Sequence, residues 1–75
     1  MKRALENICS EFSSEYSVTQ DILGFLIVIH VDIEHLGDLA DIFQNYGVEL
    51  IEIRSITDYS KRCMAIFSKT EVSDL

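Results

Sequence analysis

Residues 22–32 read Ile-Leu-Gly-Phe-Leu-Ile-Val-Ile-His-Val-Asp, and this stretch decides the fold that the sequence predicts. The run from Ile22 to Val31 is apolar at both odd and even positions, which is typical of a strand buried on both faces. The run is too short to span a bilayer, because a membrane helix needs about 20 apolar residues. We therefore expect it to form the central strand of a sheet.

The chain before this strand predicts a helix and a short strand. Residues 2–13 predict a helix with an apolar stripe formed by Leu5, Ile8 and Phe12, and Met1 extends this stripe. Residues 16–19 alternate between apolar and polar, as a half-buried strand does. Gln20 and Asp21 are compatible with a turn, so this strand would lie antiparallel beside the central one.

A second helix follows the central strand. Asp32 occupies the position of an N-cap, where its carboxylate would accept from backbone N–H groups, and Glu34 lies near the positive helix end. Gly47 follows as a natural stop in the left-handed conformation, about four turns later. The apolar stripe of this helix comprises Ile33, Leu36, Ala40 and Phe43, flanked by Leu39 and Ile42.

The rest of the chain predicts two further strands. Residues 48–56 have strand character, but the adjacent Leu50 and Ile51 break strict alternation and indicate a bulge or burial on two sides. A polar turn, a final strand and a frayed tail then follow at residues 57–61, 63–67 and 68–75.

The predicted fold is therefore one α+β domain over residues 1–75, with the order αββαββ. A ferredoxin-like split arrangement, cut before its second helix and rejoined at its old ends, gives this order. A four-stranded antiparallel sheet would carry both helices on one face, with Leu5, Ile8, Phe12, Leu36, Ala40 and Phe43 pressed onto it. The other face also needs cover, so we expect a homodimer that pairs sheet against sheet.

Composition limits the classes of partner. The 75-residue chain is 48% hydrophobic and 25% charged, which argues against disorder, and its formal charge of −7 disfavours nucleic acid and anionic membranes. Cys9 and Cys63 lack metal-ligand spacing and read as buried thiols rather than a disulfide. Without a secretory signal, the expected location is the cytoplasm.

From Phe25 to about Phe67 the chain resembles an ACT domain, a small-molecule-sensing module of amino-acid metabolism. The resemblance rests on the strand at 26–31, the helix ending at Gly47 and the entry Val48-Glu49-Leu50-Ile51-Glu52-Ile53 into the next strand. It implies a ligand site at the helix start, formed by Asp32, Ile33, Glu34 and His35. The family has a Pro-Gly or similar pair there, whereas this chain has Ile33 and Glu34. Taking Gly37 as the family glycine would shorten the helix by about one turn, so we place Gly37 inside the helix as a close-packing or exposed residue.

The other polar residues favour structural roles. His30 and His35 lie on different elements, and no third ligand has recognisable spacing, so we expect no metal and no cofactor. We interpret Arg54, Lys61 and Arg62 as cross-strand charge partners of Glu49 and Glu52, with an anion site as the alternative. No Ser or Cys lies in a Gly-rich elbow, and no glycine-rich loop would hold phosphate, so we expect no enzyme.

Three functions remain open from the sequence. The first is a regulatory or adaptor module that binds a small metabolite or a partner protein around Asp32 to His35. The second is a small acidic protein inhibitor that covers a basic surface of its target. The third is a structural subunit of a larger complex, whose isolated chain would be unstable.

Overall fold

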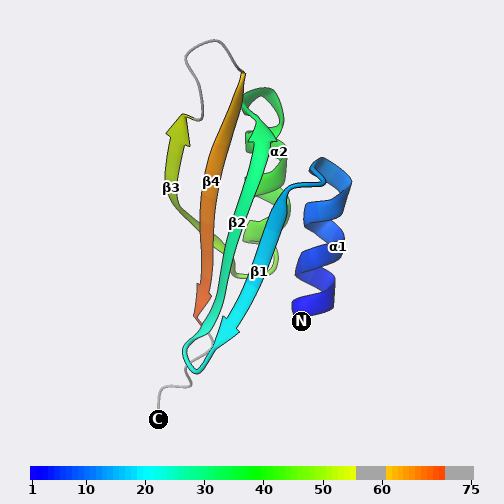
Figure 1. Cartoon of the computed structure of the whole chain (residues 1–75). Helices are drawn as coiled ribbons and strands as arrows, with labels where there is room; N and C mark the ends of the chain where they lie inside the picture. The colour runs from blue at the N-terminus through cyan, green and yellow to red at the C-terminus, as the bar shows by residue number, and fades with distance from the viewer. Residues whose placement is uncertain (56–60, 71–75) are drawn as a thin grey trace.

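The computed structural model describes residues 1–55 and 61–70 and has the predicted α+β order. Two helices and four strands follow one another as αββαββ (Figure 1). Their bounds are α1 Lys2–Phe12, β1 Tyr16–Asp21, β2 Gly24–Asp32, α2 Ile33–Gln44, β3 Glu49–Ser55 and β4 Arg62–Thr70.

The four strands form one sheet in the order β1-β2-β4-β3, with every neighbouring pair antiparallel. The predicted central strand is confirmed, because β2 pairs with β1 on one side and with β4 on the other. Strands β2 and β4 lie in the middle of the sheet. β1 and β3 are therefore the two edges of the sheet.

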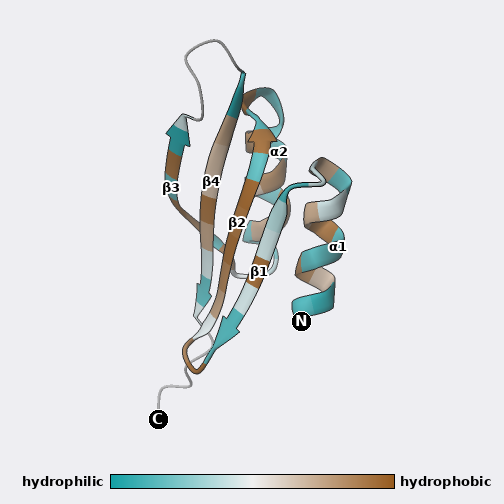
Figure 2. Cartoon of the chain, viewed as in Figure 1, coloured by the Kyte–Doolittle hydropathy of each residue, from teal (hydrophilic) through white to brown (hydrophobic). Residues whose placement is uncertain are grey.

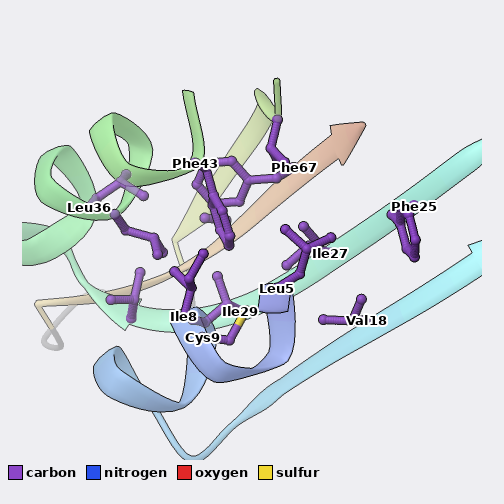
Figure 3. Close-up of a cluster of buried hydrophobic side chains, with 14 of the residues drawn as sticks. Leu5, Ile8, Cys9, Val18, Phe25, Ile27, Ile29, Leu36, Phe43 and Phe67 are labelled. Carbon is purple, nitrogen blue, oxygen red and sulfur yellow. The ribbon is translucent and has the colours of Figure 1, made fainter. Parts of the chain in front are cut away.

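The core lies between the helices and one face of the sheet (Figure 3). Of the predicted contacts, Leu5, Ile8, Leu36 and Phe43 are buried, while Phe12 and Ala40 are partly buried against them. The strands contribute alternate residues, which include Val18, Ile27, Ile29, Val31, Cys63, Ala65 and Phe67. Both helices thus cover the same face, and Figure 1 shows the sheet from the opposite, uncovered side.

The β1–β2 hairpin turns at Ile22 and Leu23, so the prediction of a turn at Gln20 and Asp21 is wrong. The Oδ1 atom of Asp21 accepts hydrogen bonds from the backbone N–H groups of Leu23 and Gly24, at 2.8 and 3.0 Å. Gly24 has a φ of 148°, in the region that favours glycine. Asp at the first and Gly at the fourth position suit a tight turn, and this local chemistry overrides the apolar character of Ile22 and Leu23.

The two ends of α2 differ in how they are capped. Asp32 occupies the N-cap position, but its side chain makes no cap hydrogen bond, which corrects the prediction. Its carboxylate instead lies 4.0 Å from the Nε atom of Arg62. Ile33, predicted as the first residue of the apolar stripe, is 57% exposed because it lies at the helix start beyond the edge of the packed residues.

At the other end, Gly47 is confirmed as the stop, with a φ of 74°. Val48 N–H donates to the Phe43 carbonyl at 3.0 Å, and Gly47 N–H donates to the Gln44 carbonyl at 3.1 Å. These two bonds form a Schellman motif, and the buried Phe43 and Val48 supply its apolar contact.

The last two strands confirm the bulge and correct one boundary. The register of β3 against β4 shifts between Leu50 and Glu52, where the sequence predicts a bulge. Strand β4 continues to Thr70, so residues 68–70 are not a frayed tail, because they pair with β2 from Leu26 back to Gly24. The predictions for 56–60 and 71–75 fall outside the described residues.

Candidate functional site

The predicted ligand residues lie at the junction of β2 and α2. Asp32, Ile33, Glu34 and His35 are all exposed. Glu34 Oε1 accepts from Lys61 Nζ at 3.2 Å, and Ile33 N–H donates to the Lys61 carbonyl at 2.7 Å. The cations that precede and begin β4 therefore face both carboxylates of the junction, and the chain itself satisfies the Ile33 N–H group at the helix start.

Arg62 is the centre of a polar cluster at this end of the sheet. Its Nη1 donates to Glu15 Oε1 at 2.9 Å, and its Nη2 donates to the His30 carbonyl at 3.0 Å and to Ser13 Oγ at 3.4 Å. The second carboxylate oxygen of Glu15 lies 3.5 Å from His30 Nδ1. One guanidinium thus joins β4, β2 and the α1–β1 connection.

These contacts correct the predicted charge pairs. Lys61 and Arg62 do not pair with Glu49 and Glu52, because the start of β4 lies opposite Asp32 of β2. Glu49 and Glu52 lie opposite Ser68 and Ile66 instead. Arg54 does bind Glu52, but within the same strand.

The uncovered face of the sheet has an apolar centre, which we call the open face. Val28 lies directly opposite Ile66, and His30 lies opposite Met64, in the pairing of β2 with β4. The centre comprises Leu26, Val28, Met64 and Ile66, of which Leu26 is 43% exposed and the others are half-buried. Figure 2 shows this apolar character along β2, in contrast with the paler β1 beside it.

Polar side chains surround this centre on both sides. On β1, Ser17 and Thr19 lie opposite Val28 and Leu26. On β3, polar and charged residues lie opposite Ile66, Met64 and Ser68, namely Glu52, Arg54 and Glu49. The open face therefore has an apolar middle and a polar rim.

Two shallow hollows mark the ends of the open face. One, of about 370 Å³, is lined by Glu15, Tyr16, Ser17, Val28 and His30 beside the Arg62 cluster. The other, of about 280 Å³, lies near the hairpin, and its apolar lining includes Leu23, Leu26, Phe25 and Ile51. Sequence analysis missed both hollows, because they depend on how neighbouring strands pair.

The remaining candidate residues from the sequence are the two histidines and the two cysteines. His30 lies on the open face, whereas His35 lies on α2, and no group of His, Cys, Asp and Glu within residues 1–55 and 61–70 is arranged to hold a metal. Cys9 and Cys63 are buried free thiols, as predicted. Burial raises the pKa of Cys9 to about 11, with a further contribution from Glu6, and burial together with Asp32 raises the pKa of Cys63.

Comparisons with known proteins identify no family for this chain. No family model, curated protein or solved structure matches this chain. Among the described residues, neither helix is long and apolar enough to cross a membrane.

Proposed function

We propose that this chain is a non-catalytic regulatory or adaptor module whose working surface is the open face of its sheet. One observation carries the proposal: Leu26, Val28, Met64 and Ile66 form an apolar centre on a face that no other part of the described chain covers. Protein interfaces commonly combine an apolar core with a polar rim, and here Ser17, Thr19, Glu49, Glu52 and Arg54 surround the centre.

A protein suits this surface better than a small metabolite. The hollow beside Glu15 is lined by residues of β1, β2 and the turn before them, so it has no opposing wall. Small-molecule sites usually bury most of the ligand surface within a cleft. A flat sheet face with an apolar strip offers a protein a broad contact instead. Sheet-to-sheet pairing of two copies is one way to cover the open face.

The cytoplasm is the compartment we propose, because Cys9 and Cys63 are both free thiols. Nucleic acid remains excluded from the proposal by the formal charge of −7.

Affinity purification with a matched pair of variants tests the proposal. Leu26→Lys adds a cation to the open face, and Asn7→Lys adds the same cation to the exposed side of α1. Proteins retained by the wild-type chain from extracts of its native cells should also be retained by Asn7→Lys and be lost with Leu26→Lys. Retention by all three chains would contradict the open face as the working surface. Thermal unfolding checks that Leu26→Lys stays folded.

A second candidate function, an acidic inhibitor, is favoured by the solvent side of α2. Glu34, Asp38 and Asp41 are all exposed there, and the helix carries no Lys or Arg. A basic target surface would bind this side by charge, so its affinity should fall steeply with added salt. Asp38→Asn with Asp41→Asn should weaken such a complex, whereas Leu26→Lys should not.

A further inference from the structure

The two edges of the sheet differ in what they expose. Edge β1 presents Ser17, Thr19 and Gln20 to solvent, which suits a strand that has to stay unpaired. Edge β3 instead exposes three large aliphatic side chains, namely Leu50 at 39%, Ile51 at 58% and Ile53 at 47%. An exposed apolar edge strand is a ready site for pairing with another chain.

The pairing of β3 with β4 assigns four side chains of β3 to a face of the sheet. Leu50 and Ile53 lie opposite the buried Phe67 and Ala65, so they extend the core on the helix side. Glu52 and Arg54 lie opposite Ile66 and Met64, so they belong to the open side. On the helix side a hollow of about 230 Å³ lies between α2 and β3, lined by Ala40, Gln44, Val48, Glu49 and Leu50. Beside β3, the edge of the apolar core is therefore exposed to solvent.

We propose that a second copy of this chain pairs antiparallel along β3, about a two-fold axis at Ile53. Antiparallel pairing about one residue sets residue 52 opposite residue 54 of the other strand. Ile53 would then face the partner's Ile53 on the helix side. On the open side, Glu52 would face the partner's Arg54, and Arg54 would face the partner's Glu52.

Charge complementarity selects this register. Glu52 and Arg54 already form an ion pair within one strand, so the two copies would build a square of four alternating charges. Pairing about Glu52 would instead set Glu52 against the partner's Glu52, and like charges directly opposite each other are destabilising. The bulge lies between Leu50 and Glu52, so Glu52, Ile53 and Arg54 form a regular strand segment, and an axis at Ile53 pairs these three residues.

This pairing goes beyond the proposed function and leaves the apolar centre of the open face free. A two-fold axis perpendicular to the sheet keeps the helices of both copies on one side. The two open faces would then lie side by side on the other side. Each Ile53, which is 47% exposed, would gain the partner's Ile53 as an apolar neighbour, which covers part of the exposed edge of the core.

Sedimentation equilibrium of the full chain, with charge variants, tests the pairing. Arg54→Glu and Glu52→Arg each place like charges across the axis, so each should weaken dimerisation by about tenfold or more. The double variant carrying both substitutions restores opposite charges across the axis and should restore the dimer. Gln20→Glu, on edge β1 and outside the rim of the open face, is the control and should leave the dimer unchanged.

Disulfide trapping gives an independent readout that does not depend on charge. Opposed residues of antiparallel strands have Cα atoms about 4.5–5.5 Å apart, which is within the range of a disulfide. Oxidised Ile53→Cys should form a covalent dimer, while Thr19→Cys on the other edge should stay uncrosslinked, and the buried native cysteines should not react.

Three results would overturn the pairing. They are a monomeric wild-type chain, a dimer that tolerates Arg54→Glu and Glu52→Arg alike, and cross-linking of Ile53→Cys no faster than that of Thr19→Cys. A dimer lost only with Leu26→Lys would identify sheet-to-sheet pairing instead. Because the open-face test uses a separate variant and a separate readout, failure of either proposal leaves the other standing.

Discussion

The ring of Phe43 in α2 packs edge to face against the ring of Phe67 in β4, with centroids 4.9 Å apart and planes inclined at 65°. Both side chains are completely buried, so this contact joins the second helix to the last strand at the middle of the core. We predict that Phe43→Leu lowers the free energy of unfolding by about 1–3 kcal/mol, through lost volume and the lost aromatic pair. Urea denaturation measures the change.

Tyr46→Leu is the control for this substitution. Tyr46 is 40% exposed just beyond the same helix, so Tyr46→Leu should lower the free energy of unfolding by less than Phe43→Leu. Equal costs for the two variants would contradict the assignment of Phe43 to the centre of the core.

One substitution should have opposite effects at two glycines. Gly47→Ala should destabilise by about 1–2 kcal/mol, because a φ of 74° is unfavourable for a residue with a Cβ atom, and that atom would lie 3.1 Å from Lys69 Nζ. Gly37→Ala should stabilise by about 0.5–1 kcal/mol, because Gly37 is exposed within α2 and, apart from its chain neighbours and the nearby backbone of its own helix, nothing lies within 4 Å of the added Cβ. Thermal unfolding of both variants checks the signs.

The sequence predicts the elements of this fold because their signals are local. The i, i+3 and i+7 spacing of Leu5, Ile8 and Phe12 is a property of one helix and needs no knowledge of the rest of the chain. Gly47 likewise predicts a left-handed backbone conformation at its own position, which ends the helix. The Asp21 to Gly24 turn was also readable, since Asp and Gly occupy the first and fourth positions, but the apolar Ile22 and Leu23 concealed it.

The candidate sites depend on which strands are neighbours, and local patterns do not contain that information. Arg62 meets Glu15 and Asp32 because β4 lies between β2 and β3, and its starting residue pairs with the end of β2. The exposure of Leu50, Ile51 and Ile53 likewise follows from the edge position of β3. In sequence they resemble the residues of a buried strand.

Arg62 should stabilise the fold through the hydrogen bonds that its planar guanidinium group donates. Arg62→Met removes the hydrogen bonds to Glu15 and to the His30 carbonyl, and should cost about 1 kcal/mol, since the 40% exposure of the side chain allows solvent to screen the charges. Arg62→Lys should lose less stability than Arg62→Met but should still be less stable than the wild type, because an ammonium group lacks the planar arrangement of donors of a guanidinium group.

Lys61→Met serves as the neighbouring comparison. The Lys61–Glu34 pair is 79% and 63% exposed, and such surface pairs contribute little. A loss with Lys61→Met as large as that with Arg62→Met would show that net charge, rather than the Arg62 contacts, sets the stability.

The buried thiols should make stability sensitive to alkaline pH. The pKa of Cys9 is raised from 9.0 to about 11, chiefly by burial, so between these values the unfolded chain releases a proton that the folded chain keeps. This contribution to stability is fully present below about pH 9 and is lost as the pH rises through 11.

Denaturation of the wild-type chain and of Cys9→Ala across this pH range measures the effect. The variant should be less stable at neutral pH because of the lost core volume, but it should lose less further stability above pH 9 than the wild type. The two chains differ only at residue 9, so the difference between the two curves isolates Cys9. Parallel curves would contradict a Cys9 thiol that burial keeps protonated, because only a pKa that differs between the folded and unfolded states makes the two curves diverge.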